Sequence, residues 1–303
     1  MLRAAAVADL SAFRGRWFVV KIGGELAQDV PRLSRTVGAA VRAFLDAGIK
    51  VCVVHGGGPQ ATELAKKLGL ETKQVAGQRV TDEATLEVMK MTLAGQVSVN
   101  VASALRIAGV PALCTTGVSG GLVDASRRPP VDVAGIEGPV DYGLVGDIAA
   151  VNVTMLETLA ERGVVVGLGS LAGDVHGRVF NVNADTVATR VAGKLRAARL
   201  LLVSNVPGVL KDRNDPSSRI PRLTPREARA QIAAGVIQGG MIPKVEESLA
   251  MLDEGIDAIH IVGLSPESAI LDEALDPGRC GTVFVKEEAV VAARSGHATM
   301  TLP

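Results

Sequence analysis

The amino-acid sequence predicts an α/β protein built around a mainly parallel sheet, and two observations support this class. Short runs rich in β-branched residues alternate with longer segments whose apolar residues recur at helical spacing, which is typical of βαβ units. The chain has 303 residues, of which 48% are hydrophobic and 21% charged. One large domain or two ordinary ones can therefore bury a sizeable core.

The first strands and helices follow in order along the chain. The run WFVVKI at 17–22 predicts a strand, and apolar residues at four-residue spacing predict a helix over about 31–47 that ends before Gly48. The run IKVCVV at 49–54 predicts the second strand. Pro59 then suits the first turn of another helix, because its fixed φ is already helical.

The rest of the chain continues the alternation after one irregular stretch. A helix over about 82–108 leads to a strand within 110–116, whereas residues 117–150 are rich in Gly, Pro and Asp and predict hairpins and loops. Further strands are expected within 162–171, 178–185, 199–206, 256–263 and 281–286. We place a division near residue 185, between an N-terminal half (1–185) and a C-terminal half (186–303) that share one continuous sheet.

Composition excludes several classes of function. Lys+Arg and Asp+Glu are both 32 and aromatic residues make up 2%, which argues against a nucleic-acid binder. No apolar run reaches the ~18 residues of a membrane helix, and we read no signal peptide. The cysteines are odd in number and far apart, typical of reduced thiols in a cytoplasmic protein. No His or Cys spacing suggests a metal cage.

Two glycine-rich turns follow predicted strands, in VVKIGGE (19–25) and VCVVHGGGPQ (51–60). Either alone is compatible with a simple turn. Parallel strands end at one edge of a sheet, however, so both turns should face the same crevice, where open α/β sheets bind ligands. Bare backbone N–H groups at a helix start favour an anion. Neither turn matches the G-x-G-x-x-G or P-loop pattern.

Other motifs have a simple structural interpretation beside the functional one. In NVNAD, Asn183 can cap a helix and Asp185 can face its dipole. In GGMIPK, Lys244 opposes the dipole of the helix that it begins, which favours a ligand-facing role. Arg79 is expected in a polar loop before a helix. GVSGG (117–121) fits a hydrolase nucleophile elbow, but no helix is predicted after it.

Six motifs occur in one order across nearly the whole chain: KIGG, HGGGP, GQRVT, NVNAD, SNVPGVL and GGMIPK. This set resembles the amino acid kinase family. The resemblance implies a three-layer αβα sandwich, with the amino acid held by the N-terminal half and the nucleotide by the C-terminal half. It implies that ATP, with Mg²⁺, phosphorylates the side-chain carboxylate of N-acetyl-L-glutamate to the 5-phosphate, a step of arginine biosynthesis.

The resemblance also implies roles for individual residues. The catalytic residues would be Lys21, Lys244, Asp185, Gly24 and Gly57. The amino acid would contact Gly57, Gly58, Arg79 and Asn181. The nucleotide would contact Gly23, Ser204, Val206, Gly208, Gly240, Met241 and Lys244, and no metal ligand is expected because Mg²⁺ would be held mainly through ATP. The lysines would stabilise negative charge from two sides, and Asp185 would hold both lysines in place rather than act as a base.

The glycines and the polar side chains would then bind different parts of the ligands. The glycines would offer N–H groups where any Cβ would intrude on the reacting groups. Arg79 would clamp the α-carboxylate, for which a planar guanidinium suits bidentate pairing. Asn181 would donate a hydrogen bond to the amino acid.

Some features depart from the family pattern or leave alternatives open. GVSGGL (117–122) lacks the lysine and acid of the family's G-L-S-G-K-D, which leaves the substrate-side hairpins open. A homodimer is expected. An N-terminal helix (1–16), together with Glu273 and Gly281-Thr282, leaves open a hexamer that is inhibited by arginine. Binding of a nitrogen-signalling regulator is also open. Rival substrates are glutamate, aspartate, carrier-bound aminoadipate and carbamate. A non-catalytic regulator on the same fold is the other alternative.

Overall fold

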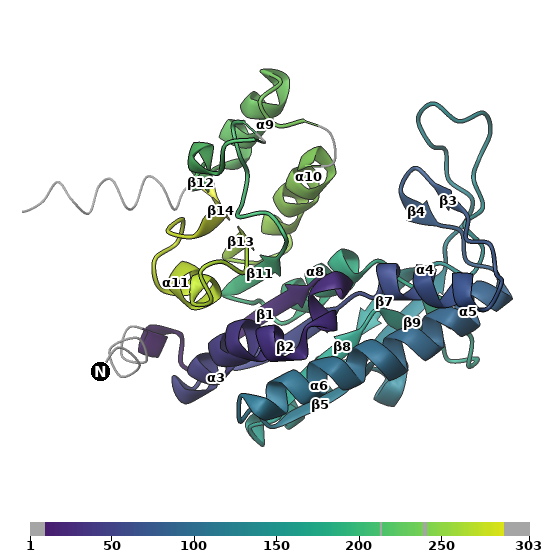
Figure 1. The fold of residues 1–303 in the computed structure, drawn as a ribbon, viewed down its shortest axis with the longest axis horizontal. Coiled ribbons are helices and arrows are strands. Elements are labelled where there is room, and N and C mark those ends of the chain that lie inside the picture. The colour runs from purple at the N-terminus through teal and green to yellow at the C-terminus, as the bar shows by residue number, and fades with distance from the viewer. Residues whose placement is uncertain (1–9, 213, 239–240, 288–303) are drawn as a thin grey trace, which may run out of the picture.

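The protein is described by a computed structural model that covers residues 10–212, 214–238 and 241–287, without the side chains of Pro243, Lys244 and Glu247. A central eight-stranded sheet runs through the molecule (Figure 1). Its strands, in spatial order, are β12 (Arg222–Leu223), β14 (Gly281–Val285), β13 (Ala258–Val262), β11 (Arg199–Val203), β1 (Trp17–Ile22), β2 (Lys50–His55), β8 (Val165–Gly169) and β5 (Ala112–Thr116).

The sheet is parallel from β13 to β5, as predicted. At its other edge β14 pairs antiparallel with β13, and the two-residue strand β12 pairs with β14 beyond it. The strand expected within 281–286 is therefore not the edge of the sheet, and β12 was not predicted. β1 lies in the middle and pairs with β2 on one side and β11 on the other, so strands from both halves of the chain share one sheet.

Helices cover both faces of the sheet, which confirms the three-layer sandwich. One face packs against α7 (Val153–Glu161), α8 (Ala184–Lys194) and α10 (Met241–Leu252). The other packs against α2 (Val30–Leu33), α3 (Ala39–Asp46), α6 (Ser98–Ile107) and α11 (Ala269–Leu275). In β1, Val19 faces the first core and its neighbours Phe18 and Val20 face the second. Because strand side chains alternate, one strand supplies both cores.

Two predicted helices contain π-helical segments. The helix expected over 31–47 is α2, η3 (Ser34–Gly38) and α3 in succession. The helix expected over 82–108 is α5 (Glu83–Lys90), η4 (Met91–Val97) and α6. Of the predicted N-terminal helix, only a short 3₁₀ helix, η1 (Leu10–Phe13), lies among the described residues; residues 1–9 lie outside them.

A second, four-stranded sheet has the order β10 (Val179–Asn181), β9 (Leu171–Gly173), β6 (Val123–Arg127) and β7 (Gly146–Val151). Strands β6 and β7 come from the predicted hairpins, whereas β10, which was expected in the central sheet, pairs here with β9. The strand β6, rather than a helix, comes after GVSGG, so the hydrolase elbow is absent. A separate hairpin joins β3 (Gln74–Val75) to β4 (Gln78–Arg79). Figure 1 shows this hairpin at the upper right of the molecule, apart from α10 at its upper centre.

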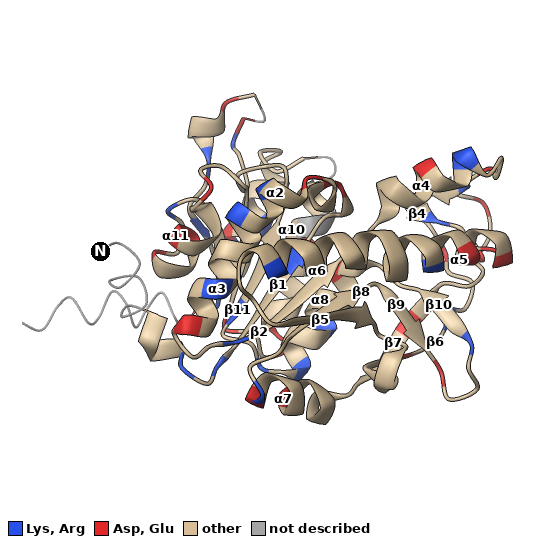
Figure 2. Ribbon diagram, turned by 60° about the horizontal axis from the view of Figure 1, so that its bottom comes forward, with Lys and Arg blue, Asp and Glu red and all other residues tan. Residues whose placement is uncertain are grey.

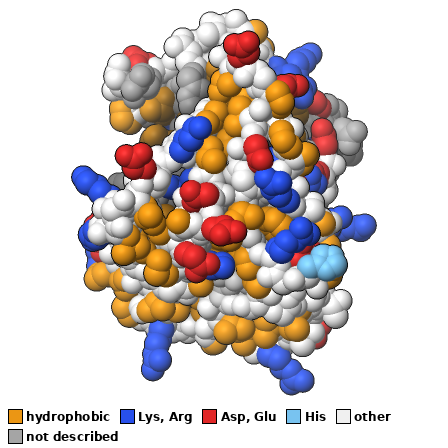
Figure 3. Space-filling model, turned by 90° about the vertical axis from the view of Figure 1, so that its right-hand side faces the viewer, with side chains coloured by type: hydrophobic (Ala, Val, Ile, Leu, Met, Phe, Trp, Pro, Cys, Tyr) orange, Lys and Arg blue, Asp and Glu red, His pale blue; other side chains and the backbone are white. Residues whose placement is uncertain are grey.

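The surface agrees with the neutral composition. Figure 2 shows the positively and negatively charged residues distributed along the ribbon without segregation into one region. On the face viewed in Figure 3, apolar side chains are interspersed with charges of both signs. None of the described helices is long and apolar enough to span a membrane.

Candidate active site

The two glycine turns leave neighbouring strands at the same edge of the sheet and contact each other. The ends of β1 and β2 are in register, with Ile22 beside His55. A Cβ added at Gly24 would lie 2.7 Å from the Cα of Gly57, too close for any real side chain. At Gly57, an added Cβ would lie 2.9 Å from a methyl of Leu93. Gly24 is therefore required by the close approach of the two backbones, and Gly57 by its packing against buried side chains.

A Cβ at either Gly24 or Gly57 would collide with the protein itself. That a Cβ there would also intrude on the reacting groups stays a prediction. At Gly58, an added Cβ meets no described atom within 4 Å, so only here is the space beyond the backbone open. Gly58 is the first residue of α4 (Gly58–Lys67), and Gly57 is its N-cap, so the first N–H groups of this helix lie at the turn. Such a helix start attracts anions.

His55 fixes the second glycine turn from inside the core. Its ring is fully buried, with Nε2 3.0 Å from Oγ of Ser98 and Nδ1 3.3 Å from the carbonyl oxygen of Gly56. Burial lowers the pKa of His55 to about 4, because the charged ring would lose its hydration. At neutral pH His55 is an uncharged structural residue.

Lys21 and Asp185 form an ion pair at the edge of the sheet. The Nζ of Lys21, near the end of β1, lies 2.7 Å from Oδ1 of Asp185 in the first turn of α8. Both side chains are largely shielded, so this pair is more constrained than a surface salt bridge. Asn183 caps α8 by accepting from the N–H of Asp185 at 2.7 Å, which confirms the capping interpretation of NVNAD. The structure thus brings together residues 164 positions apart in sequence.

A cavity of about 400 Å³ extends from this ion pair. It is lined by the four residues expected to hold the amino acid, Gly57, Gly58, Arg79 and Asn181, and by Gly24, which was expected to be catalytic. Arg79 lies on β4, not in the predicted loop. Its guanidinium donates to the carbonyl of Gly58 at 3.1 Å and to Oγ1 of Thr62 at 2.7 Å, so it lies against the start of α4.

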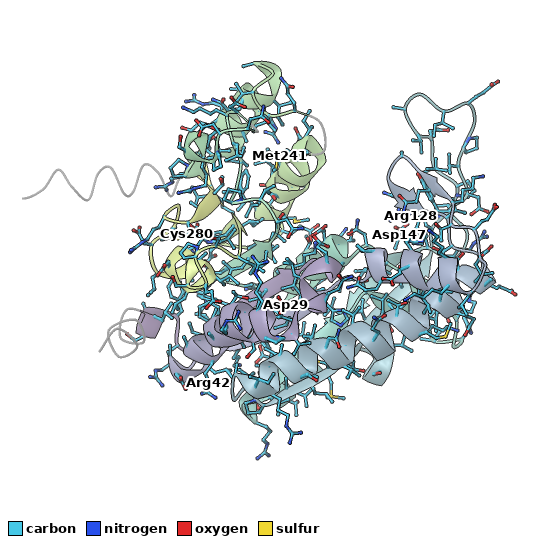
Figure 4. The ribbon with its side chains drawn as sticks, in the orientation of Figure 1. Asp29, Arg42, Arg128, Asp147, Met241 and Cys280 are labelled. Atoms are coloured by element: carbon cyan, nitrogen blue, oxygen red, sulfur yellow. The ribbon has the colours of Figure 1, made fainter. Side chains whose placement is uncertain are left out.

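Arg128 is a second guanidinium on this cavity, and the sequence analysis did not identify it. It donates to Oδ1 of Asp147 at 2.8 Å and to Oε1 of Gln78 at 2.9 Å, and Figure 4 shows Arg128 and Asp147 together below the β3–β4 hairpin. Gln78 is the neighbour of Arg79 in β4. The two adjacent arginines in SRRPP were the only hint of this residue in the sequence. They did not place Arg128 at the cavity, because its position there depends on a hairpin whose fold the sequence did not predict.

The expected nucleotide residues line two further cavities. A small one of about 60 Å³ includes Gly23 and Ser204 and shares Lys21, Gly23, Glu25 and Asp185 with the amino-acid cavity. A larger one of about 780 Å³ includes Val206, Gly208 and Met241, and Figure 4 shows Met241 on the side of the molecule opposite Arg128. Gly240 lies outside the described residues, as does the side chain of Lys244, whose backbone is in the first turn of α10.

Thr282 shapes the wall of the larger cavity. Its hydroxyl accepts from the N–H of Val209 at 2.9 Å and donates to the carbonyl of Ile220 at 2.6 Å. Gly208 has a φ of 145°, and a Cβ added there would lie 2.6 Å from Oγ1 of Thr282. Gly208 is therefore needed both for its backbone conformation and for its close approach to β14.

These features define a class of protein: an open α/β protein with glycine turns suited to an anion at the carboxyl ends of parallel strands, next to cavities large enough for small ligands. The chain belongs to the amino acid kinase family, whose family model matches residues 16–263. That membership makes it one of a family of kinases, which use ATP.

Two curated relatives cover nearly the whole chain. It is 48% identical to acetylglutamate kinase of Anaeromyxobacter sp. (strain Fw109-5) over 269 residues, which is 88% of this chain and 98% of the relative. It is 47% identical to acetylglutamate kinase of Sorangium cellulosum (strain So ce56) over 286 residues, 94% of this chain and 100% of the relative.

Solved structures share the fold. N-acetylglutamate synthase from Neisseria gonorrhoeae, complexed with coenzyme A and N-acetyl-glutamate, matches with a TM-score of 0.77 at 23% identity over 94% of this chain and 63% of that chain. Carbamate kinase from Giardia lamblia bound to AMP-PNP matches with a TM-score of 0.63 at 17% identity, over 90% of this chain and 99% of that chain. These likenesses support the architecture alone.

Proposed function

We propose that this protein transfers the γ-phosphoryl group of ATP to the side-chain carboxylate of N-acetyl-L-glutamate, as a step of arginine biosynthesis. The observation that carries the proposal is the Lys21–Asp185 pair, which lies beside the two glycine turns and on the wall shared by the amino-acid cavity and a nucleotide-side cavity. The names of the relatives at 47–48% identity support the same substrate.

In the proposed reaction, a carboxylate oxygen attacks the γ-phosphorus. A new O–P bond forms while the bond to the β–γ bridging oxygen breaks, and ADP leaves with the electron pair. The nucleophile is already ionised, so no proton is removed and Asp185 is free to orient Lys21. Catalysis then depends on positioning and on neutralising charge, for which Lys21, Lys244 and the glycine N–H groups are suited.

The amino-acid cavity suits a substrate whose α-amino group is blocked. The acids that line its described part, Glu25 and Asp185, both lie at the wall shared with the nucleotide side. Arg79 is available to bind the α-carboxylate, and Asn181 to form a hydrogen bond with the acetamido group. Buried Met89 and Val145 provide an apolar surface for a methyl group. A free ammonium would have no acid to pair with away from the shared wall, which favours the acetylated amino acid over glutamate or aspartate.

Mg²⁺ is proposed to enter with ATP and to be held mainly through the phosphates. The residues present fit a metal–nucleotide complex, because Glu25 and Asp185 place hard carboxylate oxygens on the shared wall. When bound, the metal would neutralise charge on the phosphates. A cytoplasmic location and the division into an amino-acid half and a nucleotide half stay proposals of the same kind.

The proposal is tested by trapping the acyl phosphate with hydroxylamine. The full chain is incubated with ATP, Mg²⁺ and one acid at a time: N-acetyl-L-glutamate, glutamate, aspartate or carbamate. We expect hydroxamate with N-acetyl-L-glutamate, and none with glutamate or aspartate. Product with another acid alone would assign the protein to a sister kinase, and ATP binding without product from any acid would favour a regulatory protein.

We further propose a homodimer formed through η4, α6 and the edge strand β5. Large apolar side chains on these elements are between 47% and 66% exposed: Met91, Val99, Ile107 and Leu113. The helix α6 has a single charged residue, Arg106. β5 ends the eight-stranded sheet and so presents an unpaired edge that a second copy can cover. A hexamer through residues 1–9 and feedback by arginine stay open.

Light scattering after size-exclusion chromatography tests the dimer. We expect twice the 31.2 kDa chain mass for the wild type, and a shift toward the monomer for the double variant Val99→Glu/Ile107→Glu. Val175→Glu is the matched control, because Val175 is also apolar and highly exposed but lies elsewhere, after β9. A double variant that keeps the wild-type mass would place the interface on another surface.

A further inference from the structure

Gln60 joins the two glycine turns from the side away from the cavities. It is the third residue of α4, it is 3% exposed, and it lines none of the cavities described above. Its side-chain Nε2 donates to the carbonyl oxygen of Gly24. Gly24 itself approaches Gly57, so one side chain connects the turn after β1 to the helix after β2.

The amide of Gln60 lowers the stability of the folded state at this buried position. Its Oε1 is buried and has no hydrogen-bond partner among the described residues. A buried acceptor without a partner destabilises the folded state, and an apolar side chain of similar length would avoid that cost. Stability alone therefore does not favour glutamine here, and the bond to Gly24 is the interaction that glutamine adds.

That bond fixes the direction of a peptide group at the site. The Gly24–Glu25 peptide is planar, so holding the carbonyl of Gly24 toward Gln60 directs the N–H of Glu25 to the opposite side. Glu25 and Gly24 both line the amino-acid cavity, whereas Gln60 does not. None of the hydrogen bonds found among the described residues uses the N–H of Gly24, Gly57 or Gly58, so these donors are available to a ligand.

We propose that Gln60 is a positioning residue for phosphoryl transfer, which acts through Gly24 to aim the backbone donors of the two glycine turns at the transferring group. This inference rests on the proposed kinase function. Preorganised donors contribute to catalysis only when they are already aimed at the developing charge. Loss of the Gln60–Gly24 bond should therefore lower the rate of the chemical step and leave ground-state binding of either substrate nearly unchanged.

The test uses Gln60→Met, which keeps the side-chain length without the donor, and Gln60→Glu, which replaces the donor with a carboxylate oxygen and adds a negative charge. For both we expect kcat to fall about 10-fold or more, with the KM of ATP and of the acid within about twofold of wild type. Gln60→Met should keep or raise the melting temperature, because it removes the unsatisfied acceptor. The acid used is whichever one the wild type phosphorylates.

Thr92→Val is the matched control. The hydroxyl of Thr92 is also buried without a described partner, and its methyl lies on the other side of Gly57, 3.4 Å from where a Cβ would be. This variant changes packing beside the glycine turns but does not touch Gly24, so its kcat should stay within about twofold of wild type. An equal loss in Thr92→Val and Gln60→Met would overturn the positioning role, as would an unchanged kcat in folded Gln60→Met.

A binding measurement separates this inference from the proposed function. Calorimetry compares MgADP with MgADP plus aluminium fluoride, which imitates the transferring phosphoryl group. Gln60→Met should weaken binding of the fluoride complex about 10-fold relative to wild type and leave MgADP binding unchanged. If the wild type phosphorylates no acid, but Gln60→Met still binds the fluoride complex more weakly than the wild type does, only the proposed function is refuted. Equal affinities in wild type and variant would refute the role of Gln60.

Discussion

Lys21 contributes a charge that its position on the central strand holds firmly at the shared wall. The adjacent strand bears a comparable lysine: Lys50 of β2 pairs with Glu157, as Lys21 pairs with Asp185. Lys21→Ala should lower kcat by about 10²-fold, because it removes a charge that stabilises the transition state more than the ground state. Steady-state kinetics with Lys50→Ala as the control should show a kcat close to wild type.

The paired design makes the outcome specific. Both variants remove one lysine and one ion pair from neighbouring strands, so a general loss of stability would affect both. A Lys21→Ala enzyme with near-normal kcat would contradict the assignment of the phosphoryl site to this edge of the sheet. Lys244→Ala is expected to behave as Lys21→Ala does.

Arg79 should act mainly on binding of the amino acid. Its guanidinium lies on the cavity wall beside Gly58 and Thr62, and burial lowers its pKa without removing its charge at neutral pH. Arg79→Ala is expected to raise the KM of the acid about 10-fold or more, since a charge-assisted pair is lost from the ground state and the transition state alike. Arg127→Ala, which breaks an exposed pair with Asp141, is the control. A change confined to the KM of ATP would show that Arg79 is misplaced.

Individual residues differ in how far the sequence could predict them. Lys21 and Asp185 could be assigned because each lies in a short motif of its own, and the structure brings them into contact. The sequence did not indicate that Gly24 approaches Gly57 closely, which is a reason for a glycine there that does not depend on a ligand. Arg128 could not be found, because only the fold of the hairpins brings it to the cavity from a segment without a recognisable pattern.

At the scale of elements, the β3–β4 hairpin is attached by a few side-chain contacts. The hydroxyl of Tyr142 donates to the carbonyl of Val75 at 3.2 Å, and Gln78 accepts from Arg128. Tyr142→Phe removes one such bond, worth about 1 kcal/mol, and loosens the element that carries Arg79. We expect the KM of the acid to rise about fivefold while kcat and the KM of ATP stay nearly constant.

Kinetics on a second variant tests whether the hairpin is the cause. Thr115→Val also removes one hydroxyl hydrogen bond, from Thr115 on β5 to Ser119, and neither residue lines the amino-acid cavity. Its KM values should match wild type. If Tyr142→Phe leaves the KM of the acid unchanged, the remaining contacts of Gln78 and Arg79 hold the hairpin without Tyr142.

A strand or helix could be predicted when its own residues showed a clear pattern of burial. β1, β2 and β11 are buried on both faces, so their continuous apolar runs gave their bounds to within a residue or two at most ends. β12, β3 and β4 have two residues each, too few for any periodicity to appear. The π segments η3 and η4 lie inside patterns that also fit regular helices, so the sequence predicted the helices without their local widening.

At the scale of the whole molecule, the sheet joins both halves of the chain, so the buried histidines should affect the stability of the entire fold. His55, on β2, has a folded-state pKa of about 4 against a usual value of 6.5. Between these values the unfolded chain binds a proton that the folded chain does not. The free energy of unfolding must therefore fall as the pH is lowered from about 6.5 toward 4.

The predicted size follows from the two pKa values. At pH 5 the contribution of His55 is a loss of about 2 kcal/mol relative to neutral pH. Burial also lowers the pKa of His260, which adds to the loss in the same direction and acts equally in wild type and variant. Urea unfolding at pH 7.5 and pH 5 should therefore show a drop in wild type that exceeds the drop in His55→Asn by about 2 kcal/mol. Equal drops would mean that His55 titrates normally in the folded state, and that the second glycine turn opens to water without unfolding of the sheet.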